Sequence, residues 1–185
     1  MKKKLTYYIL ALLSFLSVDS LTLISAQVDS LRDFSAEKDL TIRLMPIKEN
    51  FKRINSIANW TSIDAKGLWE SIEGGEIKYY YQNDILEKIV TRHYGEMFQR
   101  LTEYYSLNGQ LSFVYVKHYR YYKTFDFENS EIFEHRSYFE NGVMIHHISD
   151  QSEASPFSDY YFLEEISRLR ASYEKYVAGK DLEEL

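Results

Sequence analysis

Three of the five histidines fall where a metal site is conceivable. His135 lies before the pair Asn141-Gly142, and His146 and His147 follow it. With that pair as a two-residue hairpin loop, His135 and His146 are diagonal neighbours on one face and His147 points the other way. Zinc needs further ligands, and no third one comes within reach in this register. Solvated histidines are the simpler interpretation, so no metal site is predicted.

Catalytic groups are not singled out by the sequence. Glycoside hydrolysis needs a pair of carboxylates with distinct roles, and none of the 28 acidic residues is marked as one of such a pair. The chain has no G-x-S-x-G motif, phosphate loop or dinucleotide-binding glycine pattern. It also has no cysteine, which excludes disulfides and thiolate chemistry. No catalytic residue and no cofactor is predicted; a small envelope-directed hydrolase with unidentified carboxylates remains the alternative.

The strongest candidate for recognition is an aromatic and basic band. Residues 103–122 read EYYSLNGQLSFVYVKHYRYY. With Asn108-Gly109 as a two-residue loop, one face of this hairpin gathers rings and cations, which are enriched at binding hot spots. The predicted binding residues are Tyr104, Phe113, Tyr115, Tyr119 and Arg100. The alternative is that the band lies under a helix, where cross-strand aromatic pairs stabilise the sheet.

These residues require a sheet to position them. Six segments rich in β-branched and aromatic residues are predicted strands: 75–82, 85–94, 97–107, 110–122, 131–140 and 143–148. Asn83-Asp84, Asn108-Gly109 and Asn141-Gly142 separate three pairs of them, and such dipeptides tolerate the positive φ of tight hairpin turns. The chain therefore reads as an antiparallel meander of about six strands.

A helix is predicted on each side of the meander. Pro46 opens a periodic apolar pattern that predicts a helix over 46–58, after an irregular or partly strand-like lead-in over 27–44. Phe162, Ile166 and Leu169 continue into Tyr173 and Tyr176 at helical spacing, which predicts a helix over 157–178, ended by Gly179. The expected class is α+β.

The first 26 residues are typical of a signal peptide. Lys2, Lys3 and Lys4 precede an apolar stretch too short to span a bilayer, and the small residues Ser25 and Ala26 end it. Residues 27–185 are then expected to form one domain. Export without cysteine is more typical of bacteria, so a periplasmic or secreted protein is expected, with no membrane span after cleavage.

The charge balance narrows the class of partner. The chain holds 28 acidic and 22 basic residues, and three of its lysines lie in the leader. An acidic domain lacks the electrostatic footprint of a nucleic-acid binder, so no nucleic-acid partner is expected. The expected partner is a protein, a peptide or a glycan in the cell envelope or outside the cell.

Three stretches of the chain share one pattern: YYYQNDIL, YYSLNGQL and SYFENGVM. Each has aromatic residues, then Asn with Asp or Gly, then an aliphatic residue two places on. The pattern resembles the tyrosine-rich hairpins of MORN-like repeat proteins, although the spacing between copies is irregular. The overall plan also looks like that of small exported bacterial proteins without an assigned activity. The resemblance implies a non-catalytic interaction domain.

Overall fold

The computed structural model describes residues 36–70, 72–150 and 158–180, except for the side chains of 158–163. The predicted signal peptide, residues 1–26, lies outside the described residues. The chain divides into two compact units, residues 1–43 and 44–185. In the first unit residues 36–43 are helical, and Arg43 pairs with Asp39 at 3.9 Å one helical turn away. The sheet and the segments that cover it belong to the second unit.

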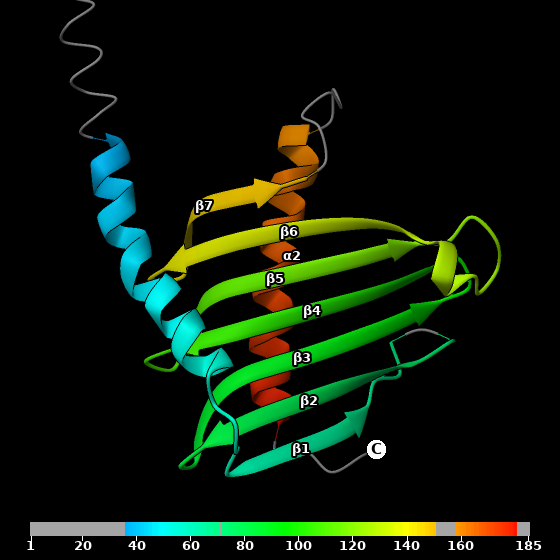
Figure 1. The fold of residues 1–185 in the computed structure, drawn as a ribbon, viewed down its shortest axis with the longest axis horizontal. Coiled ribbons are helices and arrows are strands. Elements are labelled where there is room, and N and C mark those ends of the chain that lie inside the picture. Colours follow the sequence, from blue (N-terminus) through cyan, green and yellow to red (C-terminus); the bar gives the residue numbers. More distant parts are fainter. Residues whose placement is uncertain (1–35, 71, 151–157, 181–185) are drawn as a thin grey trace, which may run out of the picture. The chain divides into compact units, whose positions relative to one another are not determined.

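Seven antiparallel strands form one sheet, and each pairs with its neighbours in the chain (Figure 1). They are β1 (Ser62–Gly67), β2 (Gly75–Gln82), β3 (Ile85–Gly95), β4 (Phe98–Leu107), β5 (Gln110–Arg120), β6 (Glu131–Glu140) and β7 (Val143–Ser149), with a 3-10 turn at Phe127–Asn129. The predicted α+β meander is confirmed. The six predicted strands correspond to β2–β7. β1 was not predicted, because all but one of its residues are exposed and leave no alternation of apolar and polar residues.

The three hairpins with asparagine turns share one geometry. Both turn residues have positive φ in Asn83-Asp84, Asn108-Gly109 and Asn141-Gly142. This is the conformation of a type I′ turn, which glycine and asparagine adopt at little cost. Each turn was predicted as a tight reversal, and each prediction is confirmed.

A β-bulge follows each of these turns at the same distance. The second strand of each hairpin carries one unpaired residue three places after the turn, namely Glu87, Ser112 and Ile145. A bulge of this kind reverses the alternation of faces along its strand. The alternation expected from an unbroken two-residue period therefore fails beyond each bulge.

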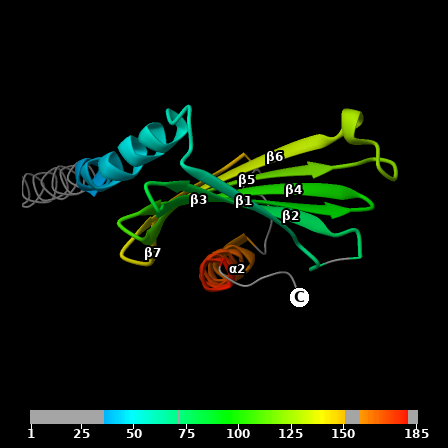
Figure 2. The ribbon, with the colours of Figure 1, turned by 90° about the horizontal axis from the view of Figure 1, so that it is seen from below.

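Helix α2 (Ser158–Gly179) covers one face of the sheet (Figures 1 and 2). Its residues Leu169, Tyr173 and Tyr176 are buried against apolar side chains from β2 to β6. Burial of such side chains stabilises the fold by roughly 1.5–3 kcal/mol each. The predicted C-terminal helix is confirmed, while the Phe162 side chain lies outside the described residues. Within the described ranges no helix is both long and apolar enough to cross a membrane.

The other face of the sheet is covered by the end of an N-terminal helix, which runs over residues 36–55 (Figure 2). Leu44, Ile47 and Ile54 of this helix are buried. The prediction that Pro46 opens the helix and that an irregular segment precedes it is wrong for residues 36–45. Those residues are mostly good helix formers, and the helix continues through Pro46 at the loss of one backbone hydrogen bond.

Candidate ligand site on the α2 face

The bulge at Ser112 distributes the predicted binding residues over two faces. Tyr104 pairs with Val114, and Tyr105 pairs with Phe113, one residue away from the predicted register. Tyr104 and Arg100 therefore lie on the α2 face. Phe113, Tyr115 and Tyr119 lie on the opposite face. The prediction that all five share one face is wrong, and their role in binding stays a prediction.

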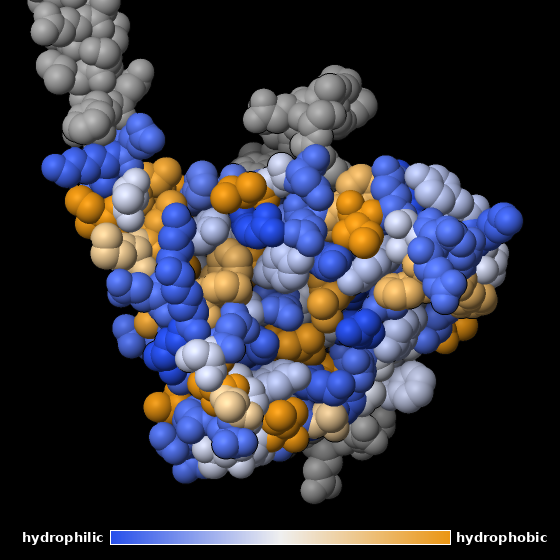
Figure 3. Space-filling model, in the orientation of Figure 1, coloured by the Kyte–Doolittle hydropathy of each residue, from blue (hydrophilic) through white to orange (hydrophobic). Residues whose placement is uncertain are grey.

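On the sheet face that the N-terminal helix covers, aromatic and charged side chains contact neighbouring side chains. Phe113 is buried, and its ring centroid lies 5.1 Å from that of Phe51 in the helix. Farther along β5, Lys117 lies over the Tyr119 ring at 5.4 Å. Arg136 is 2.6 Å from Glu134. Figure 3 shows polar and apolar residues interspersed over this face. The aromatic and charged groups named here are therefore in contact with one another on this face.

The histidine register also differs from the prediction, because of the bulge at Ile145. Ser137 pairs with His147, and Tyr138 pairs with His146. His135 and His147 share the α2 face with their rings stacked 5.9 Å apart, while His146 points to the other face. The prediction that His135 and His146 are diagonal neighbours on one face is wrong. Among the residues that the structure describes, no group of three histidines, aspartates or glutamates is arranged to hold a metal ion.

Three basic side chains form a row across the α2 face. His93 of β3 pairs directly with Arg100 of β4, and Arg100 pairs with His118 of β5. Direct neighbours of this kind have Cβ atoms about 5 Å apart. Figure 1 shows that α2 crosses the sheet nearer the asparagine turns, so the strand ends at the β5–β6 loop run past the helix. The row lies toward that less covered end.

Helix α2 adds an ion pair beside this row. Arg168 Nε donates to Glu165 Oε2 at 2.8 Å, and a second guanidinium nitrogen contacts Oε1. Burial opposes ionisation of Glu165, but the bonds from Arg168 and the charges of Arg168 and Arg100 outweigh it and lower its pKa. The five residues His93, Arg100, His118, Glu165 and Arg168 are called the Arg100 cluster below.

Arg100 is the unusual member of the cluster. Its Nε is buried and has no hydrogen-bond partner, and the described residues supply no ion pair to its guanidinium. Burial, followed by repulsion from Arg168, lowers the pKa of Arg100. Glu165 contributes attraction, but its oxygens are bonded to Arg168. The cluster therefore holds a desolvated cation whose Nε donates no hydrogen bond to the described residues.

His93 is held from one side only. Its Nε2 lies 3.0 Å from Glu70 Oε2, and Lys175 Nζ donates to the other oxygen of Glu70 at 2.7 Å. The His93 side chain is 11% exposed, and its Nδ1 has no hydrogen-bond partner among the described residues. The hydroxyl of the fully buried Thr91, two residues earlier on the same face, also has none. Burial, Arg100 and Arg168 together lower the pKa of His93 despite the opposing effect of Glu70.

Aromatic rings flank the row at the open end of the sheet. Phe98, two residues before Arg100 and on the same face, stacks on His118 with ring centroids 5.5 Å apart. Arg120 lies over the ring of Phe133 at 4.6 Å. Phe98 is 36% exposed. The α2 face therefore combines cations and accessible rings, the combination that was expected of a recognition surface.

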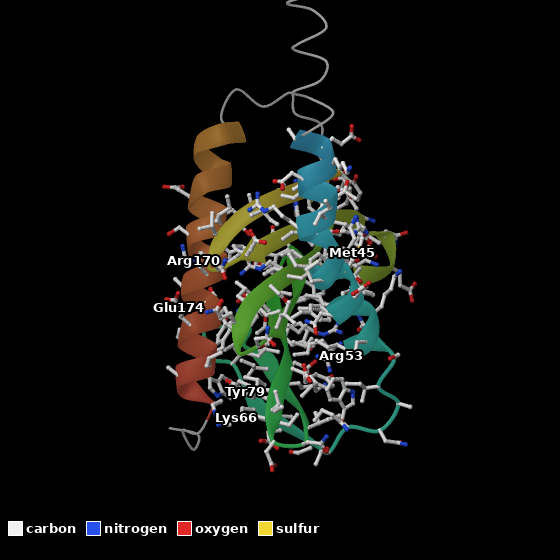
Figure 4. The ribbon with its side chains drawn as sticks, turned by 90° about the vertical axis from the view of Figure 1, so that its left-hand side faces the viewer. Met45, Arg53, Lys66, Tyr79, Arg170 and Glu174 are labelled. Atoms are coloured by element: carbon white, nitrogen blue, oxygen red, sulfur yellow. The ribbon has the colours of Figure 1, made fainter. Side chains whose placement is uncertain are left out.

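A pocket lies at the turn end of the same face. This pocket of about 270 Å³ is bounded by the β4–β5 and β6–β7 turns and by Arg170, Tyr173 and Glu174 of α2. Figure 4 shows Arg170 and Glu174 on the helix at this end. Arg170 lies 3.9 Å from Glu174, so the charges of the pocket offset each other. The pocket thus offers a ligand less than the Arg100 cluster does.

The sequence identified Arg100 but not the residues that act with it. His93 and His118 are brought beside it by strand register, and Glu165 and Arg168 by a helix distant in sequence. An Arg-x-x-Glu or Glu-x-x-Arg spacing on a helix is too common to have marked the pair. Comparison with known proteins adds no further assignment: no protein-family model, no curated protein and no solved structure matches this chain.

Proposed function

We propose that the protein is an exported, non-enzymatic binding domain that takes an acidic group of its ligand at the Arg100 cluster. One observation carries the proposal: the desolvated guanidinium of Arg100 has no acceptor among the described residues. A buried donor without a partner costs about 1–3 kcal/mol, and more if it is charged. A carboxylate or phosphate of a ligand would supply that acceptor and offset the charge.

The electrostatic balance of the site supports an anion. Glu165 offsets Arg168, and Glu70 offsets Lys175, so Arg100 is the remaining charge. A planar guanidinium binds carboxylate and phosphate oxygens with two parallel hydrogen bonds. The exposed ring of Phe98 adds an apolar contact beside the charge. A protein, a peptide or a glycan that carries an acidic group fits this description.

The hydrolase alternative gains no specific support from the site. A general acid at neutral pH needs a carboxyl whose pKa is raised. The two carboxyls at the site are those of Glu70 and Glu165, and hydrogen bonds from Lys175, His93 and Arg168 lower the pKa of both despite their burial. Both are therefore carboxylates, with the roles of orienting His93 and pairing Arg168.

Ligand-induced changes in melting temperature test the proposal. Propionate, inorganic phosphate and glucuronate are the acidic probes, and propanol and glucose are neutral controls. At least one acidic probe is expected to raise the melting temperature of the wild type but not that of Arg100→Gln. Arg92→Gln is the matched control, because Arg92 lies on the other face and pairs with Glu76 at 3.4 Å. Equal responses of the wild type and Arg100→Gln to every acidic probe would refute the site.

Export has a separate test. The basic residues Lys2 to Lys4, the short apolar stretch and Ala26 support cleavage before Gln27. Expression of the full chain in a bacterium, followed by fractionation and mass spectrometry, is expected to give a periplasmic or secreted product that begins at Gln27. An uncleaved cytoplasmic product would contradict the proposed localisation without touching the binding site.

A further inference from the structure

The hydrogen bond to Glu70 fixes the tautomer of His93. Glu70 is a carboxylate, held ionised by Lys175 at 2.7 Å, and it can only accept. The proton of neutral His93 therefore sits on Nε2, 3.0 Å from the Glu70 oxygen. The buried Nδ1 then carries a lone pair and needs a donor. His93 and Arg100 consequently make opposite demands on a ligand, since Arg100 Nε needs an acceptor.

The two demands come from adjacent positions of the sheet. His93 and Arg100 are direct partners in the β3–β4 ladder, so one small molecule can meet both. The unpartnered hydroxyl of Thr91, which both donates and accepts, lies on the same face two residues from His93. A ligand that satisfies all three carries an anionic oxygen and, close to it, a hydroxyl group.

We propose that the Arg100 cluster recognises a hydroxy acid, with the carboxylate on Arg100 and a neighbouring hydroxyl donating to His93 Nδ1. This inference rests on the proposed function and specifies its ligand class. The accessible ring of Phe98, on the same face of β4, provides an apolar platform beside the carboxylate site. Stacking of a sugar ring there fits a uronic acid, and a small free hydroxy acid satisfies the same polar groups.

Partly exposed ion pairs lie beside the buried atoms, Lys175–Glu70 next to His93 and Arg168–Glu165 next to Arg100. The Lys175 side chain is 67% exposed and that of Arg168 is 38% exposed. Ion pairs at such exposure contribute little to stability, so their rearrangement would oppose ligand entry only weakly.

Isothermal titration with matched ligands tests the inference on the full chain. Lactate and propionate differ by one hydroxyl, and glucuronate and a galacturonate oligosaccharide separate a free acid from a polymer. Lactate is expected to bind wild type about tenfold more tightly than propionate, the value of one hydrogen bond. Stronger binding of the galacturonate oligosaccharide than of lactate would identify a polymer as the source of the hydroxy acid. Stronger binding of lactate would identify a free acid.

Two further measurements locate the discrimination at His93. In His93→Phe, which keeps a ring but lacks the acceptor, lactate and propionate are expected to bind equally. As a second measurement that needs no variant, wild type is also titrated with 2-methoxypropionate, whose ether oxygen accepts a hydrogen bond but cannot donate one. It is expected to bind no more tightly than propionate, because His93 Nδ1 needs a donor. Binding of 2-methoxypropionate as tight as that of lactate would overturn the role of His93.

The outcomes separate this inference from the proposed function. If propionate and lactate bind wild type equally, and both need Arg100, the hydroxy-acid inference is wrong and the acidic-ligand proposal stands. If no acidic probe binds, both are wrong. A preference for lactate that Arg92→Gln keeps and Arg100→Gln loses supports both.

Discussion

Two arginines on opposite faces of the sheet, the exposed Arg53 and the partly buried Arg100, differ in how their charge is satisfied. Arg53, on the N-terminal helix, donates to both oxygens of Glu87, at 2.8 and 2.5 Å, and to Asn50. Arg100, on the α2 face, has no such acceptor among the described residues. Figure 4 shows Arg53 on the side of the N-terminal helix and Tyr79 on the side of α2.

The contrast distinguishes a structural cation, Arg53, from the cation that we propose for recognition, Arg100. Hydrogen bonding to Glu87 raises the pKa of Arg53, whereas burial lowers the pKa of Arg100. The first arginine fastens a helix to a bulge of the sheet, because Glu87 is the unpaired residue of the first hairpin. The second adds cost in the free protein, which a ligand would remove. The two arginines therefore differ both in burial and in charge satisfaction, and of the two only Arg53 has a carboxylate partner among the described residues.

The largest predicted effect is on the structural side. Arg53→Met leaves the Glu87 carboxylate, whose side chain is 9% exposed, without its partner. An uncompensated buried charge is expected to lower the free energy of unfolding by about 2–3 kcal/mol, measured by urea denaturation. Arg92→Met is the control, because its partner Glu76 is 39% exposed, and a loss below about 1 kcal/mol is expected there. Similar losses in the two variants would contradict the structural role of Arg53.

The α2 face is expected to destabilise the fold in acid. Burial, then the charges of His135 and His146, lowers the pKa of His147 to about 4. The unfolded chain, with an ordinary histidine pKa of about 6.5, takes up the proton first. The stability that neutral His147 contributes to the fold is therefore fully present above pH 6.5 and is lost as the pH falls toward 4. We expect the free energy of unfolding to fall by about 1–2 kcal/mol over this range. This is less than the full pKa shift of His147 implies, because its ring is partly exposed.

Denaturation of His147→Phe across the same pH range checks the source of this loss. The phenylalanine ring keeps most of the packing but does not titrate. The free energy of unfolding of the variant should therefore change less between pH 7 and 4 than that of the wild type. Parallel profiles for the two proteins would assign the acid sensitivity to other groups on this face, such as His93 and His118, whose pKa values burial also lowers.

A smaller effect is predicted for the amide that works with Arg53. Asn50 is 4% exposed, and its Nδ2 donates to the Ser106 carbonyl at 2.8 Å. Asn50→Ala removes the donor to that carbonyl and the acceptor of two Arg53 hydrogen bonds, and about 1 kcal/mol of stability is expected to be lost in urea denaturation. Glu49→Ala, at the exposed preceding position, should change stability by less than half of that. The reverse order would indicate that the helix is held mainly by other contacts.

The smallest stability change is predicted for the recognition cation. Arg100→Met replaces a desolvated guanidinium by an apolar chain of similar length, so stability is expected to stay within about 1 kcal/mol of wild type or to rise. Acidic probes should no longer raise its melting temperature. A loss as large as that of Arg53→Met would show that Arg100 is a structural cation, and the contrast between the two faces would disappear.

Most of the fold could be predicted from the chemistry of neighbouring residues in the sequence. The features that were missed depend on how strands pair with one another. The asparagine turns and the strands beside them were predicted because type I′ geometry depends on the turn residues themselves. The bulges were missed, because a glutamate, a serine and an isoleucine occupy the unpaired position and share no property. One missed residue per hairpin was enough to assign Phe113 and His146 to the wrong face.

The site was predictable only in part for a similar reason. Arg100 stood out by its type within an aromatic strand. Its isolation depends on Glu165 being held by Arg168 on a helix some 65 residues away in sequence, which no pattern in β4 reveals. The tautomer of His93 depends on Glu70, in the β1–β2 connection, a region where no functional residue was expected.

The repeated bulge gives the sheet a unit of construction. In each hairpin with an asparagine turn, the bulge shifts the alternation of side chains between the two faces by one residue. Corresponding residues of the three hairpins therefore point to the same face, whatever the sequence distance between the hairpins. Duplication of one such unit would therefore widen the sheet by two strands without inverting its faces. Growth by whole hairpins is then compatible with unchanged helices, whereas the gain of a single strand would reverse the direction of everything that follows.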